Sequence, residues 1–218
     1  MKAGFSNLDT LRKFLLGNSL SPDHQFDAAI TGIGLGMAGL CDAFCNRQFA
    51  YFESDTLIFS GDRSHYYLPR FPLVSIDQVQ MRYFIADDWT DITGQPISWN
   101  AETGLLHFGY TLGRNPLQVK VTYTGGYWCE TLEPDDENYP SDLPDAITNN
   151  QNLEARKFLL PEIVKSAWLL QCQEVWNKRD KLGLAITDTP DKQVSLDKLA
   201  LIPIARQMLQ PHVRYQLT

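Results

Sequence analysis

The chain has 218 residues, 44% of them apolar, which is enough for one sizeable domain or for a domain with a long appendage. Its formal net charge is −7, and no block of Lys or Arg stands out, so it is a poor candidate for a nucleic-acid binder that reads sequence. The weakly polar run at 28–41 is shorter than the roughly 20 residues of a membrane span. Charged residues at Asp9, Arg12 and Lys13 exclude an N-terminal signal peptide.

Two helices are expected near the N-terminus. Ser6 is followed three residues later by Asp9, as in a helix cap, and Leu8, Leu11 and Leu15 share one face, so a helix is predicted over 6–16. A second helix is predicted over 26–44, because apolar residues recur there at spacings of three and four. This second stripe consists of Ile30, Ile33, Met37, Leu40 and Phe44.

From residue 50 the apolar pattern changes to a period of two. Val119, Val121 and Tyr123 alternate with polar residues, and a similar alternation runs from Val79 to Ile85. Such alternation is typical of antiparallel strands with one half-buried face. The stretch 50–128 is therefore predicted to be a small antiparallel β region.

The acidic excess is confined to one segment, 130–145, which holds seven carboxylates, three prolines and no cation. Like charges and prolines predict an extended loop. After it, a long helix is predicted over 154–182. Pro161 lacks a backbone donor, so we expect either a kink near the start of this helix or a helix that begins close to Leu160. A last helix is predicted over 196–209. The predicted fold class is α+β, with N- and C-terminal helices around the β region.

No catalytic or metal-binding constellation stands out. The histidines are isolated, and the carboxylate pairs 87–88 and 135–136 lack the spaced oxygen ligands of a cation loop. The four cysteines form no C-x-x-C pair, so we expect free thiols in a reducing compartment. They are Cys41, Cys45, Cys129 and Cys172. No cofactor is expected.

The second predicted helix also carries Gly34-x-Gly36-x-x-Gly39, which matches the dinucleotide-binding fingerprint. No strand precedes it, although such a site needs a strand-to-helix turn. A soluble nucleotide-binding enzyme stays open as an alternative, and it would be stabilised against heat by nucleotide. The favoured interpretation is a helix face of small residues that lets another helix approach closely, and we expect this face in subunit packing. Its members are Ala29, Gly32, Gly36, Gly39 and Ala43.

Aromatic residues are concentrated in 49–128, where cations are few and form no basic run between them. This pattern argues for a core or a protein interface rather than for the stacking of nucleic-acid bases. The composition therefore favours a protein that binds protein.

Four short segments in chain order resemble the head–tail connector (adaptor, or head-completion) proteins of tailed bacteriophages. They are an aromatic-Cys-x-Arg-x-Phe run at 44–49, a Pro-x-x-Ser-Ile strand at 72–76, a Val-x-Tyr-x-x-Gly-Tyr strand at 121–127, and Leu143–Ile147 leading into the long helix. The resemblance covers about residues 6–180. It divides the chain into a connector-like domain, 1–183, and a C-terminal extension, 184–218. The positions that carry the resemblance are Cys45, Arg47, Phe49, Pro72, Ser75, Ile76, Tyr123, Gly126 and Tyr127.

The resemblance implies a structural virion protein at the head–tail junction, made in the host bacterial cytoplasm and without enzymatic activity. It would form a homo-oligomeric ring of twelve copies under the portal protein. The ring would extend the channel for viral DNA, without reading its sequence, and dock the next neck or tail protein. A tail-terminator or stopper protein of the neck is the alternative.

The resemblance also implies roles for two segments. The C-terminal extension would reach the portal through Leu196, Leu199, Ile202, Ile204, Met208, Val213 and Tyr215. The acidic loop, if it lines the channel, would repel DNA phosphates through Asp135, Asp136 and Glu137.

Overall fold

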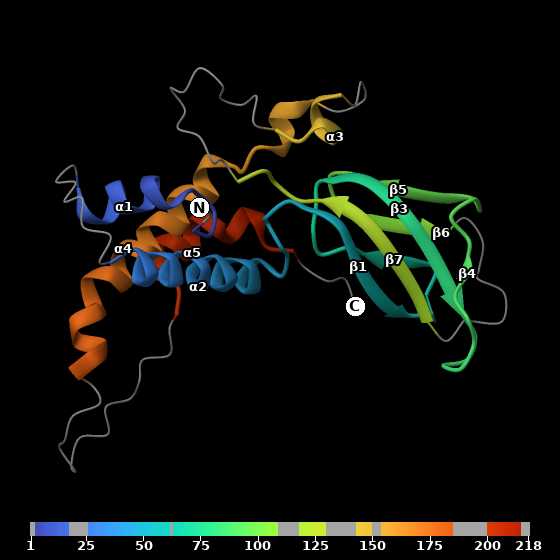
Figure 1. The fold of residues 1–218 in the computed structure, drawn as a ribbon, viewed down its shortest axis with the longest axis horizontal. Coiled ribbons are helices and arrows are strands. Elements are labelled where there is room, and N and C mark those ends of the chain that lie inside the picture. Colours follow the sequence, from blue (N-terminus) through green and yellow to red (C-terminus); the bar gives the residue numbers. More distant parts are fainter. Residues whose placement is uncertain are drawn as a thin grey trace, which may run out of the picture. The chain divides into compact units, whose positions relative to one another are not determined.

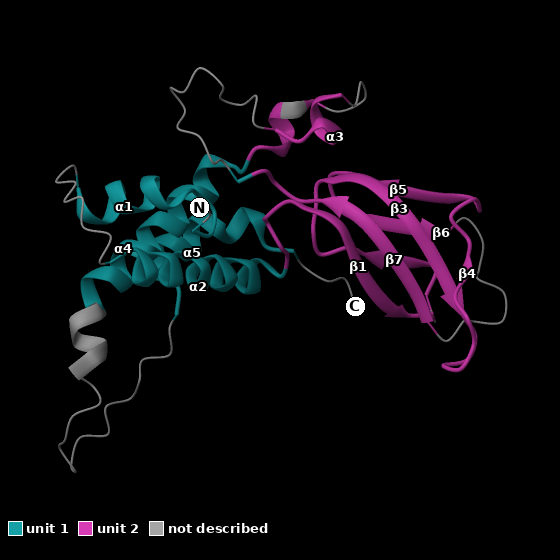
Figure 2. Ribbon diagram, in the orientation of Figure 1, with its two compact units in different colours: residues 1–46, 129–142, 160–218 teal, residues 47–128, 143–159 magenta. Residues whose placement is uncertain are grey.

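The computed structural model describes residues 3–17, 26–61, 63–108, 118–129, 143–149, 154–184 and 200–214 (Figure 1). The chain forms two compact units (Figure 2). Unit 1 comprises residues 1–46, 129–142 and 160–218, and its described part is helical. Unit 2 comprises residues 47–128 and 143–159 and contains both β-sheets. The α+β class predicted from the sequence is confirmed.

Unit 1 is built around helix α4, which packs against three other helices. The helices are α1 (Leu8–Leu16), α2 (Asp27–Cys45), α4 (Glu162–Leu184) and α5 (Pro203–Leu209), and a 3-10 turn, η3 (Gln210–His212), follows α5. Trp168 of α4 is fully buried, and its indole Nε1 donates a hydrogen bond to the Gly34 carbonyl of α2 at 2.9 Å. The described core of unit 1 includes Leu11, Ile30, Cys41, Val164, Ala167, Cys172 and Leu209.

Local residues set where these helices begin. The cap of α1 is Asn7, whose side chain accepts from the Thr10 N–H at 2.7 Å, so the predicted cap at Ser6 is one residue early. Helix α4 begins directly after Pro161, so the predicted beginning close to Leu160 is confirmed and the start at residue 154 is wrong. The described part of the C-terminal segment enters its helix at Pro203, since Ile202 is still extended. Residues 200–202 are not helical, so the described residues contradict one continuous helix over 196–209. Proline favours the first helical position, where its missing donor costs nothing.

Helix α2 buries a different stripe from the predicted one. Ile30 and Met37 are buried as expected, but Ile33, Leu40 and Phe44 are only half-buried. The other buried positions are Gly34, Ala38, Cys41 and Cys45. The helix turns small residues toward α1 and α4 because these neighbours approach it closely, and spacing alone does not reveal that approach.

Unit 2 contains two antiparallel sheets that enclose one core. The four-stranded sheet has the order β1 (Phe52–Ser60), β7 (Gln118–Gly125), β3 (Leu73–Arg82), β4 (Thr90–Asp91). The three-stranded sheet has the order β2 (His65–Tyr67), β6 (Leu105–Phe108), β5 (Ile97–Asn100). Val119, Val121 and Tyr123 of β7 are fully buried, so the predicted alternation is confirmed. The shared core also contains Tyr66, Leu68, Phe71, Leu73, Val79, Leu106 and Phe108.

The strand predicted to continue to Ile85 ends at Arg82. The Arg82 side chain donates from Nη1 to the Ile85 carbonyl at 2.9 Å, and the Phe84 N–H donates to Asp87 Oδ2 at 2.9 Å. These side chains satisfy backbone groups locally, which favours a turn over further strand pairing. The alternation of Tyr83 and Ile85 with their neighbours therefore does not reflect a strand.

The segment expected to open the long helix forms a separate short element. Leu143–Ile147 leads into α3 (Asp145–Thr148), and a 3-10 turn, η2 (Ala155–Phe158), lies between it and α4. Ile147 and Phe158 are buried and form a second small cluster with Val74 of β3. The long helix starts only after Pro161.

Candidate interaction surfaces

Two positions that carry the connector resemblance, Phe49 and Tyr127, lie beside the buried cation of a third, Arg47. Arg47 is 6% exposed, and its guanidinium carbon lies 3.5 Å from the ring centroid of Phe71, 4.7 Å from that of Phe49 and 5.1 Å from that of Tyr127. The guanidinium also donates to the Phe71 carbonyl. The rings of Phe49 and Tyr127 stack with centroids 6.2 Å apart. Segments far apart in sequence are thus tied together by cation–π contacts and aromatic packing.

The glycine of this cluster is required by the backbone. Gly126 has a φ of +99°, and a β-carbon there would lie 2.6 Å from the Ala50 carbonyl oxygen. Gly126 thus adopts a positive φ directly after β7, a backbone conformation that costs little only for glycine. The remaining motif positions also serve packing: Pro72 and Tyr123 are buried, Ser75 and Ile76 half-buried, and Cys45 buried in unit 1.

The described residues contain no group of three or more side chains that could hold a metal ion. The four cysteines are free thiols and all are buried. Burial raises the pKa of Cys41 from 9.0 to about 12, and the neighbouring Cys45 and Asp42 add to the rise. A thiol in this environment stays protonated, so it is a poor nucleophile and a poor metal ligand.

The nucleotide alternative fails on geometry, because Gly34, Gly36 and Gly39 all lie inside the continuous helix α2. A dinucleotide site needs these glycines at the turn from a strand into a helix. The structure instead gives Gly34 a packing role: a β-carbon there would lie 2.2 Å from the Ala3 carbonyl oxygen. This close crossing of α2 by the N-terminal segment was not predicted from the sequence.

The small-residue face of α2 is exposed along its whole length. Ala29, Gly32, Gly36, Gly39 and Ala43 are all exposed. No described atom lies within 4 Å of a β-carbon built at any of the three glycines. The helix is long and apolar enough by length and composition to cross a membrane, with a mean hydropathy of 1.5, although its opposite face packs inside unit 1. The uncovered face is therefore apolar and without charged side chains between Asp27 and Asp42.

The C-terminal segment is anchored to α4 by one buried amide. Gln171 is 2% exposed, its Oε1 accepts from the Ile202 N–H at 2.8 Å, and its Nε2 donates to the Ala200 carbonyl at 3.3 Å. Sequence analysis did not single out this residue. Its only sequence signal is an amide among the apolar residues of a helix.

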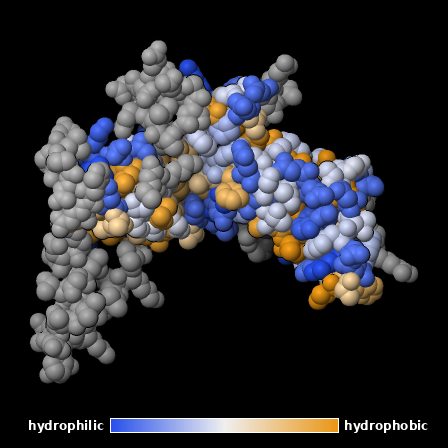
Figure 3. Space-filling model, viewed as in Figure 1, coloured by the Kyte–Doolittle hydropathy of each residue, from blue (hydrophilic) through white to orange (hydrophobic). Residues whose placement is uncertain are grey.

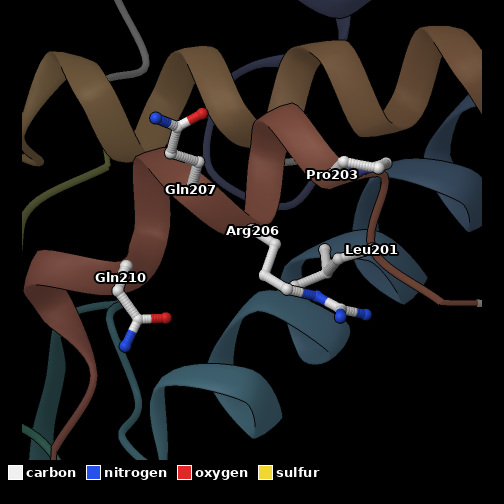
Figure 4. A pocket seen from close by; sticks show the side chains of 5 residues that line it. All are labelled: Leu201, Pro203, Arg206, Gln207 and Gln210. Atoms are coloured by element: carbon white, nitrogen blue, oxygen red, sulfur yellow. The ribbon is translucent and has the colours of Figure 1, made fainter.

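An open groove, called here the α5 groove, lies beside this anchor (Figure 4). Its lining residues are Leu201, Pro203, Arg206, Gln207 and Gln210. Of the predicted portal-binding residues, Ile204 is 54% exposed, and Ile202, Met208 and Val213 are half-buried. Leu196, Leu199 and Tyr215 lie outside the described residues, as do Asp135, Asp136 and Glu137 of the acidic loop.

Unit 2 exposes a second apolar surface, at the turn between β3 and β4. Tyr83, Phe84 and Ile85 are 41%, 69% and 71% exposed. In Figure 3 this turn forms the orange tip at the lower right. Three neighbouring exposed apolar side chains on one turn are typical of an interaction site rather than of a scattered surface residue.

No protein-family model matches the chain, and no curated protein matches it. Solved structures do match. A chain in "Neck of empty GTA particle computed with C6 symmetry" superposes with a TM-score of 0.56 at 11% identity. The fold is similar to that of proteins in a gene transfer agent (GTA) particle.

Two further structures extend this likeness. A chain in "Virion of native gene transfer agent (GTA) particle" has a TM-score of 0.53 at 13% identity, and one in "Neck of native GTA particle computed with C12 symmetry" has a TM-score of 0.51 at 11% identity. Each match covers 97% of this chain and 90% of the other chain. The likeness therefore includes both the helical unit and the β unit.

Proposed function

We propose that this chain is a structural protein of a virion neck, an adaptor that forms a homo-oligomeric ring under the portal and extends the DNA channel. The observation that carries the proposal is the fold likeness to chains in GTA neck structures over 97% of this chain. The connector resemblance of the short motifs also supports it, and three of their residues, Arg47, Phe49 and Tyr127, pack together in unit 2. No step of catalysis or cofactor binding is part of this role.

The open face of α2 is the proposed contact between ring subunits. An apolar face with nothing within 4 Å of its glycine positions allows the backbone of a neighbouring helix to approach closely. Each glycine inside a helix lowers stability by about 1 kcal/mol relative to alanine. Close packing in an assembly offsets that cost, whereas an isolated chain gains nothing from it.

The C-terminal residues supply the proposed portal contact. Ile204 presents an exposed aliphatic side chain on α5, and the half-buried Ile202, Met208 and Val213 lie near it in sequence. Leu196, Leu199 and Tyr215 are proposed to continue this surface. The acidic segment with Asp135, Asp136 and Glu137 is proposed to line the channel, where like charge keeps DNA from adhering. Twelve copies are proposed; of the two similar neck structures, one has C12 symmetry and the other C6 symmetry.

The test is gold labelling of this protein on intact virions, viewed by electron microscopy. We expect label confined to the head–tail junction. Label along the tail or at its tip would contradict the adaptor role while keeping a virion role. No label, with an epitope shown to be accessible, would contradict both. A reconstruction of a labelled neck then separates an adaptor, which contacts the portal, from a stopper or tail terminator, which lies farther from it.

A further inference from the structure

We propose that the turn Tyr83–Trp89, called here the β3–β4 tip, docks into the α5 groove of a second copy of this chain. The proposal rests on the ring formation stated above and names one contact within it. The sequence did not indicate the tip as an interface, and for the C-terminal segment it predicted a portal contact through other residues than those that line the groove.

The β3–β4 tip is held rigid by its own hydrogen bonds. Arg82 Nη1 donates to the Ile85 carbonyl at 2.9 Å, and its Nε donates to Gln118 Oε1 at 2.9 Å. At the other side, the Phe84 N–H donates to Asp87 Oδ2 at 2.9 Å and the Asp87 N–H to the Phe84 carbonyl at 3.1 Å. A turn fixed in this way loses little conformational entropy on binding, so its exposed side chains are preorganised for docking.

Cation–π contacts hold the far end of the tip as well. The Arg82 guanidinium carbon and Lys120 Nζ each lie 4.5 Å from the ring centroid of Trp89. In the same turn, Phe84 and Ile85 are 69% and 71% exposed. The side chains offered to a partner are therefore apolar.

The tip also carries negative charge, and the groove carries the matching positive charge. Asp87 and Asp88 are exposed in the same turn as Phe84 and Ile85. In the groove, Leu201 is buried and Pro203 is exposed, and together they supply apolar surface. Arg206 is exposed at the same place and forms no ion pair with any described carboxylate. An apolar knob with acidic neighbours thus meets an apolar groove with a basic one, and such charge matching fixes both partner and register.

A second copy is the occupant that these two surfaces favour. The tip belongs to unit 2 and the groove to unit 1, so a contact between them is heterologous: each copy uses one surface toward each neighbour. Heterologous contacts generate closed rings when the rotation between copies closes. A contact that pairs a surface with itself would stop at a dimer.

Disulfide trapping between full-length chains tests this contact, even where it is weak. One chain carries Ile85→Cys, and a second, distinguishable by a size tag, carries Gln207→Cys; the native cysteines are buried and do not compete. Oxidation of the mixture with dithiodipyridine is expected to link the two chains into a dimer and no further. A chain carrying both substitutions is expected to give a ladder of multimers. The matched control replaces Ile85→Cys by Glu102→Cys, at an exposed site in the turn between β5 and β6.

Charge reversal supplies the second measurement. Arg206→Glu in the Gln207→Cys chain is expected to lower the yield of linked dimer about tenfold, and Asp88→Arg in the Ile85→Cys chain to restore it. A mixed-dimer yield no higher than that of the Glu102→Cys control overturns the proposal. So does a failure of Asp88→Arg to restore the dimer yield that Arg206→Glu lowers. If trapping succeeds while gold label lies away from the junction, the neck role fails and this contact stands. If trapping fails while label lies at the junction, only this contact fails.

Discussion

At the residue scale, the glycines of α2 look alike in sequence but have opposite environments. A β-carbon at Gly34 would lie 2.2 Å from the Ala3 carbonyl oxygen, whereas one at Gly36 would meet nothing within 4 Å. We expect Gly34→Ala to lower the free energy of unfolding by about 1–3 kcal/mol, because backbone must shift to admit the methyl group. Gly36→Ala should raise it by up to about 1 kcal/mol through helix propensity. Urea unfolding of both variants measures this, and equal effects would contradict the assigned packing.

A second residue-scale prediction concerns pH. The pKa of Cys41 is raised from 9.0 to about 12 by burial, so the folded thiol keeps a proton that the unfolded thiol loses. The stability it contributes is complete below about pH 9 and is lost as pH rises from 9 toward 12. We expect the drop in unfolding free energy between pH 8 and pH 10 to be about 1.4 kcal/mol smaller in Cys41→Ala than in the native chain. Urea unfolding at both pH values checks this, and an unchanged drop would be inconsistent with the buried thiol.

At the element scale, the position of α5 depends on Gln171 of α4. The side-chain oxygen of Gln171 accepts from the Ile202 N–H, and its side-chain nitrogen donates to the Ala200 carbonyl. The residue is 2% exposed. Gln171→Leu leaves the Ile202 N–H without its partner, so we expect a loss of about 1–3 kcal/mol and faster hydrogen exchange at Ile202. Gln173→Leu, at an exposed position of the same helix, is the matched control and should change neither. Slow exchange at Ile202 in the Gln171 variant would argue against the anchor.

The turn between β3 and β4 shows how an element can be misjudged from its pattern. Alternation from Val79 continues to Ile85, and it predicts a strand throughout. The chain turns instead after Arg82, because the Arg82 and Asp87 side chains bond backbone groups of residues 84 and 85. Side-chain hydrogen bonds of this kind depend on rotamers and on neighbours such as Gln118, which a periodicity argument does not include.

At the scale of the whole molecule, the open face of α2 leads to a test of assembly. Gly36→Leu adds a side chain where the isolated chain has open space, so the monomer should fold and retain its helix content. In a ring the same side chain would separate two closely packed helices. We expect monomeric, folded protein that fails to join the neck, measured by circular dichroism and by its incorporation into particles. Normal incorporation would refute the proposed subunit contact.

The acidic segment gives the other assembly-level prediction. Neutralising Asp135, Asp136 and Glu137 together, as Asn and Gln, removes negative charge from the proposed channel lining. DNA phosphates would then be repelled less, and we expect ejection to slow or stall. DNA release from purified particles, followed by dye fluorescence, measures the rate. Replacement of Glu53, Asp77 and Glu102 in unit 2 removes the same formal charge and serves as the control; an unchanged rate in the first variant would contradict a channel role.

Local chemistry by itself determined much of this protein. Pro161 set the start of α4, and the alternation at Val119, Val121 and Tyr123 set the buried face of β7. These features follow from the backbone and side chain of the residues concerned, so they are visible without knowing their neighbours.

Only the tertiary structure decided which of several similar residues are buried and which are open. It turned Gly34 inward and Gly36 outward on the same helix, gathered Arg47, Phe71 and Tyr127 into one cluster, and exposed Phe84 on a rigid turn. Each of these outcomes depends on contacts between segments far apart along the chain. Periodicity and propensity describe a residue and its near neighbours, whereas close packing is fixed by the shapes of all the elements that meet at a point.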